Sequence, residues 1–168
     1  RVLLHICCAN CAIYPVKILR QQEHQVTDSF SITTSTLTRN IACGLRVPVV
    51  YNDDYLLEEF LVNVADEPAE RCTYCYQSRL KQAAEYAANS GYDAFSTSLL
   101  YSRYQNHKLI LEMGQELGLH YGLDFLYEDF RKGWQEGIQD SKAMGLYRQQ
   151  YCGCIYSEKD RYHPRSSN

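Results

Sequence analysis

The chain has 168 residues, of which 45% are hydrophobic and 22% are charged, and its net charge is −3. These values are typical of one soluble globular domain, and they argue against a disordered chain or two sizeable domains. No apolar run approaches the roughly 20 residues that a membrane-spanning helix needs, and the first residues lack the pattern of a signal peptide. We therefore expect a single domain over residues 1–168 in the cytoplasm, with no membrane partner and with a loosely held polar tail over residues 157–168.

The first half of the chain begins an alternation of strands and helices. Val2–Ile6 is an apolar run typical of a buried strand, and it ends directly at a pair of cysteines. A helix is expected next, with Pro15 in its first turn. Residues 27–40 show neither helical nor strand periodicity and are expected to be irregular. Val47–Tyr51 predicts the next strand.

The second half continues this alternation. Asp53 and Asp54 precede a helix that they are expected to cap. The remaining expected elements are helices over Arg71–Asn89, Leu109–Leu117 and Gly133–Met144, and strands over Asp93–Leu100 and Leu123–Tyr127. Strands separated by helices pair in parallel, and ligands bind at their carboxyl ends. The sequence thus predicts an α/β fold, a mostly parallel sheet with helices on both faces and a metal site at the carboxyl edge of the strands.

Seven of the eight cysteines fall into three close groups. The groups are Cys7, Cys8 and Cys11 after the first strand, Cys72 and Cys75 at the start of a helix, and Cys152 and Cys154 near the C-terminus. In a reducing cytoplasm, cysteines are more often ligands or catalysts than disulfides. The C-x-x-C spacing brings two sulfurs to one side of the chain, where they can hold one metal or cluster. Cys43 stands alone, and we expect it not to be a ligand.

Several chemistries use cysteines in such a pattern. A structural zinc site needs four thiolates, which the first two groups supply, but it leaves three cysteines unexplained. A thioredoxin-like dithiol would use only Cys8 and Cys11, and cysteines without a shared role seldom fall into close pairs. A four-iron cluster takes up to four thiolates and leaves three for a further metal. A cluster with a second iron therefore fits the number of cysteines best.

Four segments that contain or surround the cysteines form a distinctive combination. The segments are His5–Cys11, Glu70–Leu80, Phe95–His107, and Asp129–Trp134 through Tyr151–Ser157. In this combination and order they resemble the cobalamin-independent epoxyqueuosine reductase family, QueH, although the stretch between Val26 and Val47 departs from the family pattern. The resemblance implies an oxidoreductase that reduces epoxyqueuosine to queuosine in the anticodon wobble position of tRNA. It further implies a [4Fe-4S] cluster with a second, mononuclear iron, the tRNA as substrate, and an electron donor as partner.

A polar loop is expected at the carboxyl edge after the strand that ends near Leu100. In it, Tyr101, Arg103 and Asn106 are candidates for catalytic contacts with the substrate, and Tyr104 is a candidate for stacking on a base. Arg103 suits a phosphate, because its planar guanidinium matches the phosphate oxygens. The alternative for the whole loop is a helix cap with a solvated arginine.

A second polar segment follows the last expected strand. Asp129 is a candidate catalytic group, with a metal ligand, a general acid and a helix cap as alternatives. Arg131, Lys132 and Trp134 are candidates for RNA binding, because two cations suit the phosphate backbone and an indole suits a stacked base. The alternative is a core tryptophan with solvated neighbours.

Two other functions remain open at this stage. A cluster-dependent tRNA thiolation enzyme would need a pyrophosphate-binding loop after the first strand, where this chain has Cys7–Cys11 instead. A zinc-stabilised RNA-binding module would hold a colourless, redox-silent metal, so metal analysis separates it from a cluster enzyme.

Overall fold

The computed structural model describes residues 1–31, 45, 47–52 and 57–163. They form an α/β fold on a five-stranded sheet with the strand order β3-β2-β1-β4-β5. Every neighbouring pair of these strands is parallel, which confirms the predicted fold class. The strands are β1 Val2–Ile6, β2 Val26–Ser31, β3 Val49–Asn52, β4 Ala94–Thr97 and β5 Asp124–Phe125.

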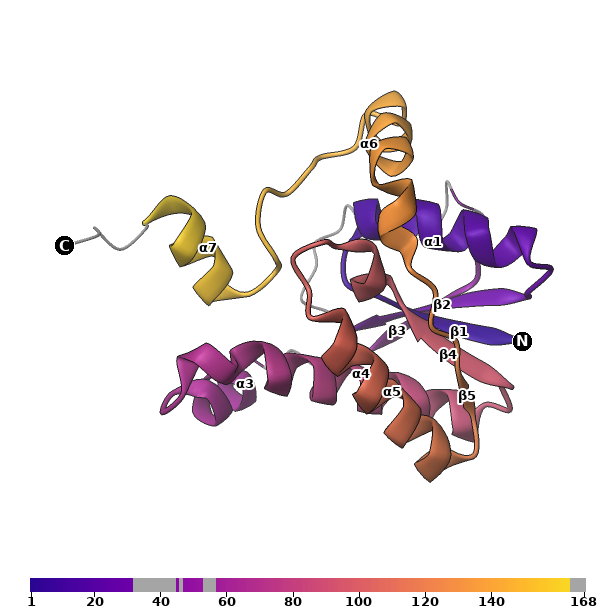
Figure 1. The fold of residues 1–168 in the computed structure, drawn as a ribbon, viewed down its shortest axis with the longest axis horizontal. Coiled ribbons are helices and arrows are strands. Elements are labelled where there is room, and N and C mark those ends of the chain that lie inside the picture. Colours follow the sequence, from indigo (N-terminus) through magenta and orange to yellow (C-terminus); the bar gives the residue numbers. More distant parts are fainter. Residues whose placement is uncertain (32–44, 46, 53–56, 164–168) are drawn as a thin grey trace.

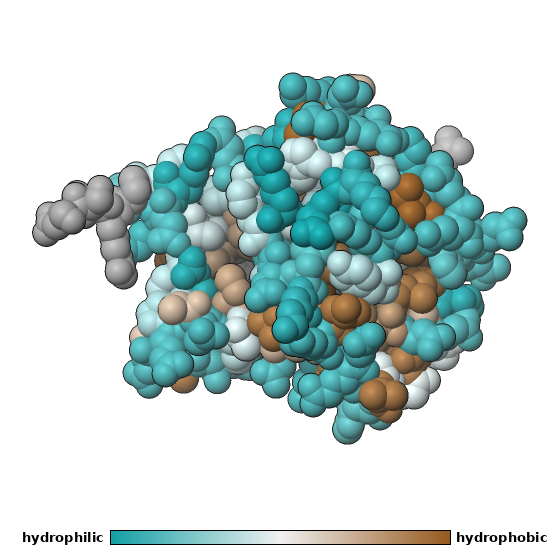
Figure 2. Space-filling model, in the orientation of Figure 1, coloured by the Kyte–Doolittle hydropathy of each residue, from teal (hydrophilic) through white to brown (hydrophobic). Residues whose placement is uncertain are grey.

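The helices cover both faces of the sheet. In Figure 1, α1 and α6 lie above it, while α3, α4 and α5 lie below, and α7 stands apart at the end of a long connection. The helices are α1 Ala9–Gln21, α3 Leu57–Val64, α4 Arg71–Asn89, α5 His107–Tyr121, α6 Trp134–Ala143 and α7 Ile155–Tyr162, with 3-10 turns η1 Pro68–Glu70, η2 Ser98–Tyr101 and η3 Phe130–Gly133. Figure 2 shows the same face of the molecule as largely hydrophilic, with scattered hydrophobic residues.

The core is centred on β1, because this strand lies between β2 and β4 and is covered on both faces. All five of its residues are buried, and Leu3 and Leu4 are 0% exposed. A strand covered on both faces reads as a continuous apolar run instead of an alternating one, which is why Val2–Ile6 was recognisable in the sequence.

Two expectations about the first half of the chain were wrong. Helix α1 begins at Ala9, so Pro15 lies in its interior and not in its first turn. Proline lacks an amide hydrogen and therefore leaves the carbonyl of Cys11, four residues earlier, without its helical partner. Residues 27–31, the start of the segment 27–40 that was expected to be irregular, belong to strand β2.

The strand expected over residues 93–100 is shorter. Only Ala94–Thr97 pairs with β1, because the chain then turns into η2. The Thr97 hydroxyl caps this turn by accepting a hydrogen bond from the Leu99 amide at 3.2 Å. β5 is likewise reduced to Asp124–Phe125.

Three further boundaries differ from the expectation. Helix α5 continues through Gly118 to Tyr121, and the left-handed φ of 69° at its C-cap residue Gly122 suits a helix end. The helix expected from Gly133 begins one residue later, after η3. Ser157–Tyr162, expected as a loose tail, belong to helix α7. The expectations for residues 32–40, for Cys43, for Asp53 and Asp54, and for residues 164–168 lie outside the described residues.

Candidate metal centre at the carboxyl edge of the sheet

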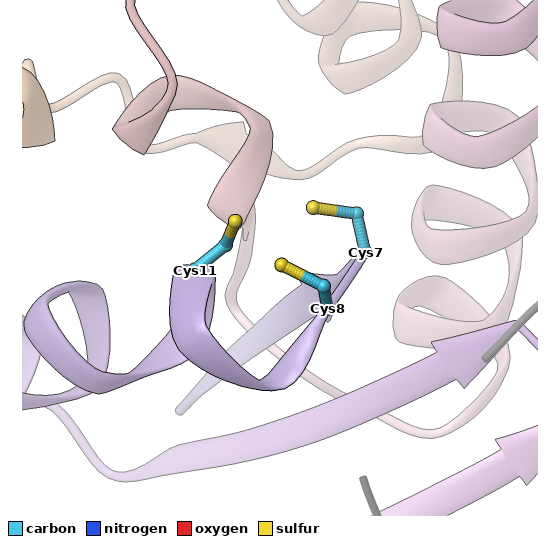
Figure 3. A group of neighbouring side chains, drawn as sticks. All are labelled: Cys7, Cys8 and Cys11. Atoms are coloured by element: carbon cyan, nitrogen blue, oxygen red, sulfur yellow. The ribbon is translucent and has the colours of Figure 1, made fainter. Parts of the chain in front are cut away.

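The first cysteine group forms a compact cluster where β1 ends. Cys7 follows the strand directly, Cys8 is the N-cap residue of α1, and Cys11 lies in the first turn of that helix. The sulfur atoms of these three residues lie within 4.8 Å of one another, and Figure 3 shows them turned toward a common point. The direct turn from strand to helix thus brings together, at the predicted carboxyl edge, three sulfurs that could hold a metal.

The Cys7 thiol is poised to lose its proton. Its sulfur accepts a hydrogen bond from the Ser98 hydroxyl at 3.4 Å, while its amide donates to the same hydroxyl oxygen at 3.0 Å. Hydrogen bonds from the Cys11 and Cys8 thiols hold the pKa of Cys7 well below its usual value. The pKa of Cys11 is raised, because its proton is engaged in the hydrogen bond to Cys7. A metal cation that binds these sulfurs takes the place of the thiol protons, so this hydrogen-bonded group of cysteines is suited to binding a metal.

The other two cysteine groups lie near the first. Cys72 and Cys75 occupy the first turn and a half of α4, and Cys154 is the N-cap residue of α7. Arg79 of α4 lies where the groups meet: burial alone would lower the pKa of its guanidinium, but the nearby sulfurs of Cys75, Cys7 and Cys152 raise it. The Arg79 cation therefore interacts electrostatically with one sulfur from each group. Only the first group has three sulfurs in mutual contact among the described residues.

An arginine and three aromatic rings lie beside this centre. The Arg103 guanidinium stands 5.2 Å from the centre of the Tyr104 ring and 5.4 Å from that of Trp134. The Tyr101 ring lies 5.3 Å from Trp134, and its hydroxyl donates to the Trp134 carbonyl at 3.1 Å. Burial raises the pKa of Tyr101 to about 12. These contacts connect the loop after β4 with the start of α6.

The exposed fractions of these side chains separate their roles. Tyr101 is 3% exposed, so it supports Trp134 from the inside and does not offer a face to a base. Tyr104 is 75% exposed and does offer one. Asn106 caps α5, because its side-chain oxygen accepts from the Leu109 amide at 3.2 Å. That contact is the helix cap considered as the alternative for this loop.

Asp129 and the two cations after it form local pairs. Asp129 caps η3 and binds the Arg131 guanidinium through both oxygens, at 2.7 Å each. Hydrogen bonds from Arg131 lower the pKa of Asp129 to about 2, so this carboxylate has no proton to give near neutral pH. Lys132 pairs with Glu128 at 3.5 Å, and Glu128 accepts from Gln22, just past the end of α1. Lys132 thus lies toward the opposite end of α1 from the cysteines.

Several residues around the centre were not identified from the sequence. Ser98, Arg79 and Gln105 each donate a hydrogen bond to a cysteine sulfur. Arg79 follows Cys75 by four residues, a spacing that places both on one side of a helix and could have signalled the contact. Nothing in the sequence signals the contacts of Ser98 and Gln105, because they depend on pairing distant segments.

The donor set fits a metal bound by sulfur. Three converging thiols, with one pKa already lowered, suit iron–sulfur clusters and zinc, whereas Mg²⁺ and Ca²⁺ prefer oxygen ligands. Cys7, Cys8 and Cys11 could each give one ligand, and one sulfur of each other pair, that of Cys75 and that of Cys152, lies close enough to Arg79 to affect its pKa. No helix among the described residues is long and apolar enough to cross a membrane.

The fold has a counterpart among solved structures. The crystal structure titled as a predicted subunit of tRNA methyltransferase from Methanocaldococcus jannaschii superposes with a TM-score of 0.59 and 13% identity, over 84% of this chain and 75% of that one. At this identity the likeness concerns the fold alone. The fold and the site together define an α/β protein with a cysteine cluster that could hold a metal at the carboxyl edge of a parallel sheet.

Sequence comparison identifies the family. Residues 2–160 match the family described as epoxyqueuosine reductase QueH, and the chain belongs to this family of oxidoreductases. A relative named epoxyqueuosine reductase QueH from Dehalococcoides mccartyi is 34% identical, over 96% of this chain and 94% of the relative. A relative of the same name from Thermotoga maritima is 32% identical, over 95% of this chain and 91% of the relative. The predicted resemblance is therefore confirmed.

Proposed function

We propose that this chain reduces epoxyqueuosine to queuosine in the anticodon wobble position of tRNA, in the cytoplasm. The reaction breaks both carbon–oxygen bonds of an epoxide, takes up two electrons and two protons, and leaves an alkene and water. The observation that carries the proposal is the family match over residues 2–160, which spans all three cysteine groups. Because each turnover consumes two electrons, a separate electron donor must supply them again before the next turnover.

The proposed cofactors are a [4Fe-4S] cluster and a second, mononuclear iron. All seven grouped cysteines are their proposed ligands, and the close triad supports this by offering three sulfurs at one point. When bound, such a centre supplies single electrons and a Lewis acid for the epoxide oxygen. The chain's own contribution is to hold the thiolates in place and to bring the modified base to the same edge of the sheet.

The proposed substrate contacts centre on Arg103. Its guanidinium is held between Tyr104 and Trp134, and the exposed Tyr104 can stack on a base while Arg103 faces a phosphate. Tyr101 fixes Trp134 from below, and Asn106 fixes the loop by starting α5. We propose these last two as residues that position the loop, in place of the direct catalytic contacts expected for them.

The proposed contacts to the RNA backbone come from η3. Arg131 and Lys132 are both cations near the surface, with side chains 41% and 73% exposed. Asp129 holds Arg131 in a bidentate pair, so its proposed role is to orient that cation and not to protonate the leaving oxygen. Since Lys132 lies away from the cysteines, we assign it to a part of the tRNA outside the reacting nucleotide.

The test is anaerobic reconstitution with iron and sulfide, followed by an assay with reductant on tRNA that carries epoxyqueuosine. About five irons to four labile sulfides, with conversion to queuosine by nucleoside mass analysis, is the expected result. Cys11→Ala should lower iron content and abolish conversion, whereas Cys43→Ala, the same change at the ungrouped cysteine, should leave both unchanged. Bound zinc without labile sulfide and without conversion would instead support an RNA-binding zinc module.

A further inference from the structure

Each cysteine group has one sulfur that accepts a hydrogen bond from a side chain outside the group. The three bonds are Ser98 Oγ to Cys7 Sγ at 3.4 Å, Arg79 Nε to Cys75 Sγ at 3.3 Å and Gln105 Nε2 to Cys152 Sγ at 3.7 Å. The donors come from η2, from α4 and from the loop before α5, so three separate parts of the fold contribute. The same kind of contact thus recurs in all three groups, and its donors are residues that are not themselves proposed ligands.

Arg79 combines a directional donor with a fixed charge. It lies one helical turn after Cys75 on α4, and its Nη1 atom is fully enclosed by protein. A guanidinium keeps its positive charge at every accessible pH. It therefore stands as a permanent cation beside a sulfur of each cysteine group, and its hydrogen bond also fixes the direction of the Cys75 sulfur.

Gln105 is oriented by a buried tyrosine. Tyr76, which is 2% exposed, donates its hydroxyl hydrogen to the Gln105 amide oxygen at 2.7 Å. The same hydroxyl accepts the Asn106 amide at 3.2 Å, which ties it to the loop. With the amide oxygen of Gln105 engaged by Tyr76, the amide nitrogen is turned toward Cys152. The direction of this donor is thus set by the core and not by the C-terminal segment that carries Cys152.

We propose that Ser98, Arg79 and Gln105 are positioning residues that hold one sulfur of each cysteine group and raise the reduction potential of the metal centre. This inference rests on the proposed function, because it requires that the cysteines hold a redox-active centre. Hydrogen bonds to ligand sulfurs withdraw electron density and set the potential of iron–sulfur centres, and partners of metal ligands also strengthen metal binding. Arg79 adds the electrostatic attraction of its charge for an incoming electron.

The test compares Arg79→Met and Gln105→Met with the unchanged chain, each reconstituted anaerobically. The midpoint potential is measured by redox titration followed in visible absorbance and electron paramagnetic resonance. Both variants should titrate at a more negative potential, and Arg79→Met should shift further because it removes a charge as well as a donor. Arg79→Lys should recover part of that shift. Ser98 is left intact, because its hydroxyl also accepts the Cys7 amide.

The matched controls are Lys81→Met and Gln77→Met, which make the same kind of change at exposed positions of α4, the helix that carries Arg79. They should titrate with the unchanged chain. Iron retention against a chelator gives a second readout: each donor variant should lose iron about 10–100-fold more readily, with its thermal unfolding midpoint preserved. Donor variants that match the controls in potential and in iron retention would overturn the inference alone. An unchanged chain that assembles no cluster would overturn the proposed function, and this inference with it.

Discussion

Asp28 is an ionisable residue in an unusual place for a carboxyl group. It lies in β2 between Leu4 of β1 and Val49 of β3, and it is 0% exposed. Neither of its carboxyl oxygens has a hydrogen-bond partner within the described part of the chain. Burial raises its pKa to about 8, although the charge of Arg20 on α1 opposes the rise. The group is therefore neutral in the folded protein at neutral pH.

This raised pKa predicts a specific dependence of stability on pH. Between about pH 4 and 8 the folded state keeps a proton that the unfolded state, with a pKa near 3.9, has lost. The free energy of unfolding should therefore fall as pH rises through this window, by up to about 1.4 kcal/mol per pH unit. Asp28→Asn, which has the same shape and no charge, should lose this part of the slope. Urea unfolding of both proteins at pH 5 and pH 8 measures the difference, and equal slopes would contradict the assignment.

Helix α5 depends on a close approach to the end of the sheet. A Cβ atom on Gly118 would lie 2.6 Å from the Leu123 carbonyl oxygen, a backbone atom that cannot rotate away. Gly118→Ala should therefore destabilise the protein by about 1–3 kcal/mol, even though alanine favours a helix by up to about 1 kcal/mol. Glu116→Ala, at an exposed position of the same helix, should change stability by less than about 0.5 kcal/mol. The midpoints of denaturant unfolding measure both changes. A Gly118→Ala chain as stable as the Glu116→Ala control would show that α5 does not need this close approach to Leu123.

The elements that the sequence predicted well are those with a strong local pattern. β1 is apolar at every position, and α4 repeats apolar residues with a helical period over nineteen residues. β2 was missed because Thr27, Asp28 and Ser29 are polar in a row, and only the neighbouring strands make that segment a strand. Gly118 was read as a helix end for a related reason: its role is to let α5 approach Leu123, which is a tertiary contact.

The candidate site was predictable to a similar degree. The spacing of Cys7, Cys8 and Cys11 after a strand was enough to place three sulfurs together, because a strand that turns directly into a helix fixes them locally. The burial of Tyr101 was not predictable, since it depends on the packing of α6 against the loop after β4. Local geometry is encoded by neighbours in sequence, whereas exposure depends on the complete fold.

At the scale of the whole molecule, the C-terminal segment touches the body through single side chains: among the described residues, Tyr156 lies against Phe60 and Arg71, and Cys152 accepts from Gln105. Figure 1 shows a long connection from α6 to α7, which carries Cys152 and Cys154. Among the described contacts, Asp160 pairs with Arg71 at 2.7 Å, and the Asp160 side chain is 63% exposed. An ion pair with an exposed partner contributes about 0–1 kcal/mol. The two cysteines are therefore the strongest attachment that the segment can gain.

Metal loading should consequently protect this segment from hydrogen exchange more than it protects the sheet. A bound centre that uses Cys152 or Cys154 ties the connection to the carboxyl edge, while β1 and β4 are already buried in its absence. Hydrogen exchange followed by mass spectrometry, on the metal-free and the reconstituted chain, should show slower exchange over residues 146–162 after reconstitution. The double variant Cys152→Ser and Cys154→Ser should lose this protection and still bind metal at the first group. Equal exchange of the segment in both forms would mean that the last two cysteines are not ligands.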